Sequence, residues 1–259
     1  MYRNSVKLAT LTAAGLVVAA CGSDSNGSGN QPTVSFNLAS HPAGAAAARM
    51  ASIAAPYTVT DGSGNTLTFE SVQLVMREIE LERADSDALC GEDDSSSDVN
   101  DSSDCEEIEF GPTIFDVPLG AGAARVMSVE VAAGSYDKLE FEIHKPSSSD
   151  DAAFVAANPD FNGVSVRVTG TYNGVAFTYT SDLDVEQEQE FAPPLAVVDG
   201  QTTQLTLFVD IDGWFRTETG VLLDPATAND GQPNEGQVKS NIETSLNAFD
   251  DDDQDGIDD

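Results

Sequence analysis

The feature that most constrains the fold of this chain is a succession of short segments in which apolar and polar residues alternate. A period of two places successive side chains on opposite faces of an extended strand, so each segment has one apolar face to bury. Hydrophobic residues make up 40% of the chain, which is enough for a substantial core. Many short strands joined by turns predict an antiparallel sandwich or barrel. The clearest of these segments are residues 33–38, 72–76, 126–131, 139–143 and 205–211.

Residues 164–181 predict a β-hairpin. Asn173-Gly174 is a two-residue turn of the kind that needs a positive φ angle at both positions, and the residues on each side alternate. Counting outward from the turn places Gly170 opposite Phe177, whose ring would cover the glycine. The same count pairs Tyr172 with Val175 and Val168 with Tyr179.

Two other local patterns complete the expected fold. The apolar alternation changes phase between Met76 and Ile79, which predicts a β-bulge or two separate strands. Helical spacing of apolar residues predicts one helix over residues 236–249. We therefore expect an all-β protein, an antiparallel β-sandwich over residues 33–215, followed by a loop and one short C-terminal helix within residues 216–249. The apolar residues that define the helix are Val238, Ile242, Leu246 and Phe249.

The first twenty residues are typical of an export signal. Arg3 and Lys7 precede an apolar run that is too short to span a bilayer as a helix. The run ends Val18-Ala19-Ala20-Cys21, which resembles the lipobox of bacterial lipoproteins. This resemblance implies cleavage after residue 20 and a lipid on Cys21. The alternative is ordinary secretion with a cysteine at this position by coincidence.

The expected location follows from the same resemblance. Acyl chains on Cys21 would anchor the protein to a membrane, and the small, polar residues that follow it would act as a tether over residues 21–32. Gly22, rather than an aspartate, follows the cysteine, which resembles the pattern directed to the outer membrane. We expect a cell-envelope protein, anchored outside the cytoplasm and most consistent with the outer membrane.

Residues 71–82, 129–139 and 205–212 together resemble an uncharacterised bacterial lipoprotein domain. That family has a long early strand and a stretch of the form polar-x-Val-x-Ala-Gly-x-Tyr leading into a later strand. The resemblance covers about residues 33–212 and implies a prealbumin-like β-sandwich. It implies no active site.

The charge of the chain is strongly negative, with 45 Asp and Glu against 11 Lys and Arg and a formal net charge of −34. Phosphates would be repelled, so the composition argues against nucleic-acid partners. It favours cations, above all calcium, which prefers carboxylate oxygens. The alternative is adaptation to a salty environment, where an acidic surface keeps proteins soluble.

Cys90 and Cys105 remain as a pair once Cys21 is assigned to the lipid. In an oxidising compartment they are expected to form a disulfide. The bridge would close an acidic, serine-rich loop over residues 90–105 that holds no basic residue. We interpret this loop either as a solvated insertion between two strands or as a cation-binding loop.

The strongest metal signal is the acidic segment 250–259, which has the form D-x-D-x-D-G-x-x-D. It resembles a single thrombospondin type 3 calcium repeat and the first part of an EF-hand loop. Carboxylates at alternate positions can converge on one cation, and the glycine permits a sharp turn. By this pattern the ligands to Ca²⁺ would be Asp251, Asp253, Asp255, the Ile257 carbonyl and Asp259. The alternative is an acidic tail that holds no ion.

Sequence motifs for catalysis are absent: the chain has no nucleophile elbow, zinc-protease, P-loop or dinucleotide signature. Of its two histidines, His144 is interpreted as a strand-end residue. Trp214 and Phe215 could stack on a sugar if exposed, or fill one end of the sandwich if buried.

The predicted function is that of a non-enzymatic, surface-anchored envelope lipoprotein with a binding or structural role. Its partners would be the membrane, through the lipid, and an envelope protein or glycan. The alternatives are a carbohydrate-binding module that uses Trp214 and Phe215, and a hydrolase with an unrecognised site.

Overall fold

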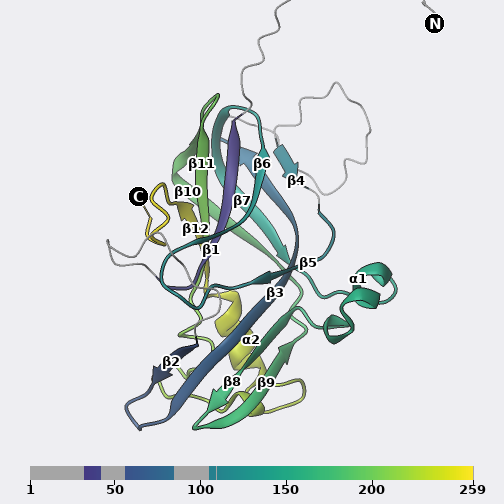
Figure 1. Ribbon diagram of the computed structural model, residues 1–259, viewed down its shortest axis with the longest axis vertical. Helices are drawn as coiled ribbons and strands as arrows, with labels where there is room; N and C mark the ends of the chain where they lie inside the picture. Colours follow the sequence, from purple (N-terminus) through teal and green to yellow (C-terminus); the bar gives the residue numbers. More distant parts are fainter. Residues whose placement is uncertain (1–31, 42–55, 85–104, 109, 259) are drawn as a thin grey trace, which may run out of the picture.

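The computed structural model describes residues 32–41, 56–84, 105–108 and 110–258. They form two β-sheets packed face to face, with little helix, which confirms the predicted antiparallel β-sandwich (Figure 1). The strands are β1 (Thr33–Ala39), β2 (Tyr57–Thr60), β3 (Thr66–Arg83), β4 (Cys105–Ile108), β5 (Thr113–Asp116), β6 (Ala124–Glu130), β7 (Gly134–Ile143), β8 (Val166–Tyr172), β9 (Val175–Ser181), β10 (Val185–Val197), β11 (Thr202–Val209) and β12 (Leu246–Asp250). The helical elements are α1 (Ala152–Ala157), α2 (Glu235–Glu243) and two 3-10 turns, η1 (Pro159–Phe161) and η2 (Pro225–Thr227).

The larger sheet is organised around β3, which runs diagonally through the molecule in Figure 1. Its strand order is β10-β7-β3-β8-β9, and β2, β4 and β5 also pair with β3. β3 is 18 residues long, so its two halves can pair with different neighbours. The first half pairs with β2, β5 and β8, and the second half with β4 and β7.

The predicted break in alternation within this strand is a β-bulge. Arg77 pairs with Glu142 and Ile79 with Phe141, so Glu78 is an extra residue on β3. Glu78 has a φ angle of 57°, which is uncommon for a residue other than glycine. The bulge resets the phase, so that Met76 and Ile79 both lie in the core.

The smaller sheet has the order β12-β11-β1-β6. Its central pair, β1 and β11, is parallel, while the other pairs are antiparallel. A parallel pair requires a long crossover connection. Here the connection is the chain from β2 to β10, which includes every strand of the larger sheet.

The hairpin of β8 and β9 has the predicted register. Gly170 pairs with Phe177, and Tyr172 with Val175. The turn residues Asn173 and Gly174 have φ angles of 50° and 78°. Positive φ at both positions is what a two-residue hairpin turn requires.

The predicted helix over residues 236–249 is wrong in its second half. Helix α2 ends at Glu243, and Leu246–Asp250 form strand β12, which pairs with the free edge of β11. The helical spacing does describe Val238 and Ile242, which are both buried. Beyond them, the backbone hydrogen bonds offered by β11 outweigh the local periodicity, so part of the segment after residue 215 belongs to the sandwich.

One hydrophobic core extends along both halves of β3. Apolar side chains of β1 and β11 face those of β3 and β7 in one half. In the other half Trp214, Phe215 and α2 cover the sheet, with the Tyr179 and Phe215 rings 5.0 Å apart. In the described ranges, no helix is long and apolar enough to cross a membrane.

Candidate functional site

The acidic loop that follows β12 lies against the outer face of the smaller sheet. Along β11, Leu205, Leu207 and Val209 face the core, so the residues between them face outward. The Asp251 amide donates to the Gln204 carbonyl at 3.0 Å, and the Gln254 side-chain amide donates to Gln204 Oε1 at 2.9 Å. These bonds fix the loop to the sheet.

Asp251 is the buried centre of this loop, with 0% of its surface exposed. Its Oδ2 accepts hydrogen bonds from the Thr206 hydroxyl at 2.7 Å and the Gly256 amide at 3.1 Å. Its Oδ1 accepts from the Asp255 amide at 2.9 Å. Burial raises the pKa of Asp251 above its ordinary value, because it penalises the charged form more than the three donors favour it.

The structure brings together three of the predicted calcium ligands. Asp251, Asp253 and Asp255 each place a carboxylate oxygen within 4.8 Å of the others. The loop is wound tightly around them: Gly256 has a φ angle of 79°, and the Asp255 amide also donates to Asp253 Oδ1 at 3.2 Å. Such a group of hard oxygen donors suits a cation better than any neutral ligand.

The other two predicted calcium ligands are Ile257 and Asp259. The amide of Ile257 donates to Asp255 Oδ1 at 2.9 Å, so this residue belongs to the loop, while its side chain is half exposed. Asp259 lies outside the described residues.

Trp214 and Phe215 are both fully buried. The Trp214 indole donates to the Ser245 hydroxyl at 2.8 Å, which ties the segment before β12 to the core. Phe215 contacts the rings of Phe69, Phe177 and Tyr179. Neither ring has a face available to a sugar, so the pair fills one end of the sandwich.

The cysteine predictions fall largely outside the described residues. Cys21 and Cys90 lie there, and Cys105 is described only as a backbone position in β4, opposite Glu82 of β3. The acidic segment therefore connects two antiparallel strands that are paired with each other. The lipid on Cys21 and the disulfide remain predictions.

A serine, a histidine and an aspartate lie side by side near the end of β1. His41 Nδ1 is 2.8 Å from the Ser40 hydroxyl, and His41 Nε2 is 3.4 Å from Asp212 Oδ1. Ser40 is buried, and its hydroxyl donates to the Pro118 carbonyl. Because this proton is already directed to a carbonyl, His41 is not placed to withdraw it, and the geometry does not suit a nucleophile.

The aspartate of this group also contacts Tyr57, whose hydroxyl donates to Asp212 Oδ2 at 3.1 Å. Burial and the neighbouring Asp212 raise the pKa of Tyr57 to about 12. Burial opposes ionisation of Asp212, but the hydrogen bonds from His41 and Tyr57 outweigh it and hold the pKa of Asp212 below its ordinary value. This network links the end of β1 to β2 and to the turn after β11.

One cluster was missed by the sequence interpretation of His144. The structure gathers Glu142, His144 and Asp184 so that one donor atom from each lies within 4.8 Å of the others. Glu142 and His144 are two residues apart, so an alternating strand would place them on one face, and this spacing was a usable signal. The contribution of Asp184 depends on which strand pairs with β7, which no local pattern reveals.

Comparisons of the chain with protein-family models, with curated proteins and with solved structures find no significant match. The resemblance to a lipoprotein domain therefore stays a prediction.

Proposed function

We propose that this protein is a lipid-anchored component of the bacterial cell envelope, with a binding or structural role, whose C-terminal acidic loop binds Ca²⁺. The observation that carries the calcium proposal is the convergence of Asp251, Asp253 and Asp255 within 4.8 Å at the spacing of a calcium loop. Three negative charges at this distance repel one another, and one of them is buried. A divalent cation would remove this repulsion and add attraction to all three.

A calcium ion here would stabilise the edge of the smaller sheet. The loop bonds to Gln204 and Thr206 of β11 and continues directly from β12. Holding the loop together therefore also holds β12 in place. The expected role of Ca²⁺ is structural, with the remaining coordination positions filled by carbonyl oxygens and water.

Thermal unfolding of the full chain tests this role. For a Kd on the order of 1 mM, about 10 mM Ca²⁺ would contribute about 1.4 kcal/mol and raise Tm by roughly 3–6 °C. NaCl at the same ionic strength provides the control. An equal rise in Tm with both salts would contradict a specific site.

The anchor is tested by Cys21→Ala. This substitution removes the thiol that the lipid requires, so the protein should move from the membrane fraction to the soluble fraction of the envelope. Mass spectrometry of the N-terminal peptide of the unchanged protein should show the acyl chains. Retention of the Cys21→Ala protein in membranes would contradict the proposed anchor.

The two alternative functions receive less support. The carbohydrate alternative relied on Trp214 and Phe215, which are buried in the core. The hydrolase alternative lacks an exposed nucleophile at Ser40, the serine that lies beside His41.

A further inference from the structure

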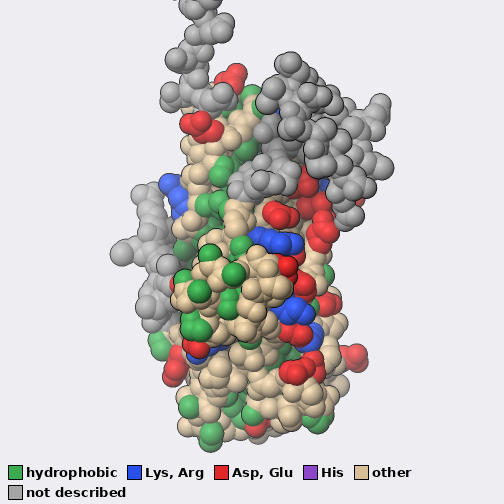
Figure 2. Space-filling model, turned by 90° about the vertical axis from the view of Figure 1, so that its right-hand side faces the viewer, with side chains coloured by type: hydrophobic (Ala, Val, Ile, Leu, Met, Phe, Trp, Pro, Cys, Tyr) green, Lys and Arg blue, Asp and Glu red, His purple; other side chains and the backbone are tan. Residues whose placement is uncertain are grey.

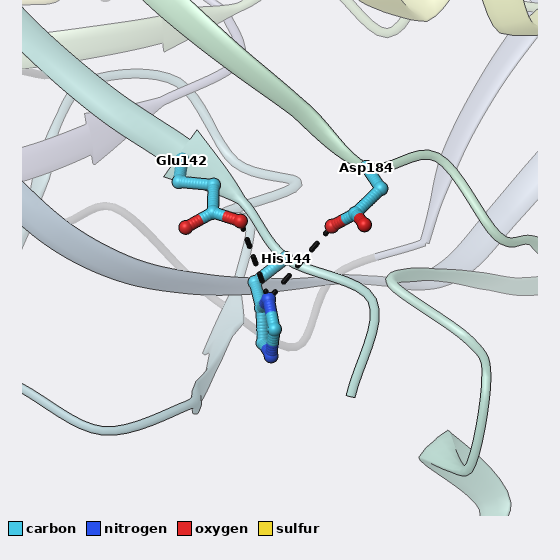
Figure 3. A group of neighbouring side chains, drawn as sticks. All are labelled: Glu142, His144 and Asp184. Carbon is cyan, nitrogen blue, oxygen red and sulfur yellow. Dashed lines mark hydrogen bonds and ion pairs between the residues drawn. The ribbon is translucent and has the colours of Figure 1, made fainter. Parts of the chain in front are cut away.

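The pairing of β7 with β10 places three potential metal ligands on one side of the larger sheet. Val185 pairs with Ile143, so continuing this register by one residue sets Asp184 opposite His144. Residues opposite each other in antiparallel strands point to the same face, and Glu142 lies on that face because it is two residues from His144. Figure 3 shows the Glu142 and Asp184 carboxylates directed at the same ring nitrogen of His144.

Asp151 determines which nitrogen of a neutral His144 ring carries the hydrogen. His144 Nε2 lies 2.8 Å from Asp151 Oδ2, and a carboxylate can only accept a hydrogen bond, so Nε2 carries the hydrogen. In a neutral imidazole the lone pair is then on Nδ1, on the side of Glu142 and Asp184. The ring is held there because His144 and the Asp151 side chain are both more than nine-tenths buried.

Nδ1 of His144 faces two carboxylates, at 3.3 Å from Glu142 Oε1 and 3.8 Å from Asp184 Oδ1. The contact with Glu142 is a hydrogen bond when Nδ1 carries a proton, whereas in the neutral ring the Nδ1 lone pair points toward both carboxylates. Three acceptors in this arrangement need a positive charge between them. A proton on Nδ1 could be shared with only one carboxylate at hydrogen-bond distance, whereas a metal ion would bind all three atoms.

The spacing suits a small divalent ion. With bonds of about 2.0–2.2 Å, tetrahedral ligand atoms lie roughly 3.3–3.6 Å apart. The separations of Nδ1 from Glu142 Oε1 and from Asp184 Oδ1 lie in or close to this range, and the three ligand atoms all lie within 4.8 Å of one another. The bond from Nε2–H to Asp151 is the outer-shell contact that orients many metal-bound histidines.

Neighbouring groups orient both carboxylates toward His144 and leave one side of the group open to solvent. Arg77 forms an ion pair with the other oxygen of Glu142, Oε2, and so orients this carboxylate with Oε1 toward His144. The backbone amide of Lys145 donates to Asp184 Oδ1 at 2.9 Å and fixes that side chain. The Asp184 side chain is 46% exposed, so solvent can reach the open side of the group and supply a further ligand.

We propose that Glu142, His144 and Asp184 form a binding site for a first-row divalent transition metal ion of the Zn²⁺ class, with Asp151 as the positioning residue for His144. One imidazole nitrogen and two carboxylate oxygens are a borderline donor set, which prefers Zn²⁺ and its neighbours over Ca²⁺. The site is separate from the acidic loop and shares no residue with it.

Calorimetric titration of the metal-free full chain with ZnCl₂, in a buffer containing millimolar Ca²⁺, tests the proposal. The unchanged protein should bind one Zn²⁺ at this site. Asp184→Asn keeps an oxygen that can accept the hydrogen bond from the Lys145 amide but removes the charge of a ligand. It should lower the Zn²⁺ affinity by at least about tenfold, because removing even an outer-shell partner of a metal site costs that much. His144→Gln should do the same, provided that circular dichroism shows it folded.

Two control variants make the test specific. Asp182→Asn removes a charge two residues away, from a carboxylate that pairs with Lys239, and should leave the Zn²⁺ affinity unchanged. Asp253→Asn should also leave it unchanged, which separates this site from the calcium loop. Absence of Zn²⁺ binding by the unchanged protein, or equal affinity in Asp184→Asn, would overturn the proposal, as would NMR spectra showing both ring nitrogens of His144 protonated in the presence of Zn²⁺.

Discussion

Asp61 shows how a single side chain fixes the turn between β2 and β3. Its Oδ1 accepts hydrogen bonds from the amides of Ser63 and Asn65, both at 2.9 Å. Its Oδ2 accepts from the Asn65 side chain at 2.8 Å and from the Leu222 amide at 3.0 Å. The turn expected from Asp61-Gly62-Ser63-Gly64-Asn65 is thus also linked to the loop after β11.

These bonds give stability a predictable dependence on pH. The hydrogen bond from the Asn65 side chain, supported by the backbone amides, lowers the pKa of Asp61 to about 2. A lowered pKa in the folded state means that Asp61 contributes its full stability above its ordinary pKa of 3.8 and loses it as pH falls toward 2. Asp61→Ala should therefore reduce the free energy of unfolding more at pH 6 than at pH 2. Urea unfolding at the two pH values measures this, and an equal loss at both would contradict the assignment.

The β8–β9 hairpin depends on a glycine that no other residue can replace. A Cβ atom on Gly170 would lie 1.9 Å from the Thr68 carbonyl oxygen of β3 and 3.2 Å from the Phe177 ring. The first contact is with backbone, so the two strands would have to separate. The sequence predicted that Phe177 covers this glycine, but not that β3 approaches it so closely.

Gly170→Ala should therefore lower the free energy of unfolding by about 1–3 kcal/mol or more, which is the usual cost of overpacking. Gly236→Ala is the matched control, because Gly236 lies in α2 with open space around it, and alanine there should stabilise by up to about 1 kcal/mol. Chemical denaturation of both variants measures the difference. A Gly170→Ala protein as stable as the unchanged one would show that β3 and β8 are not packed this closely.

Local sequence predicts some of these elements and misses others. The register of β8 with β9 and the change of phase near Glu78 depend on neighbouring residues, and both were predictable, although the sequence left open whether the change of phase was a bulge or a break between two strands. The strand at Leu246–Asp250 was not, because it forms only where β11 offers a free edge. For the same reason the acidic loop was predictable as one continuous motif, whereas the group around His144 depends on the pairing of β7 with β10.

The net charge of −34 makes repulsion between carboxylates the main electrostatic property of the molecule. Figure 2 shows acidic side chains distributed over one face, with Lys and Arg side chains beside several of them. Two of the basic residues form local clusters of this kind: Lys138 contacts Glu82 and Glu140, and Lys239 contacts Asp182 and Glu235. With 45 acidic residues against 11 basic ones, ion pairs cannot neutralise most of the negative charge.

This excess predicts that salt stabilises the protein. Raising NaCl from about 0.05 M to 1 M shortens the Debye length from more than 10 Å to about 3 Å and screens the repulsion between carboxylates. Tm should rise gradually over this range without saturating at millimolar concentrations. A Tm that falls with NaCl would mean that the ion pairs contribute more to stability than the repulsion costs.

Calcium binding by the loop after β12 can be followed through its backbone amides in NMR spectra during a Ca²⁺ titration. The amides of Asp255, Gly256 and Ile257 donate to the proposed ligand carboxylates, so they should shift saturably with a Kd on the order of 10⁻⁴–10⁻³ M. Asp253→Asn should weaken this binding because it removes one ligand charge, whereas Asp258→Asn, which removes an equal charge from a non-ligand position of the same loop, should not. Amide signals that stay unchanged by Ca²⁺, or that respond alike in the two variants, would show that this loop holds no specific Ca²⁺.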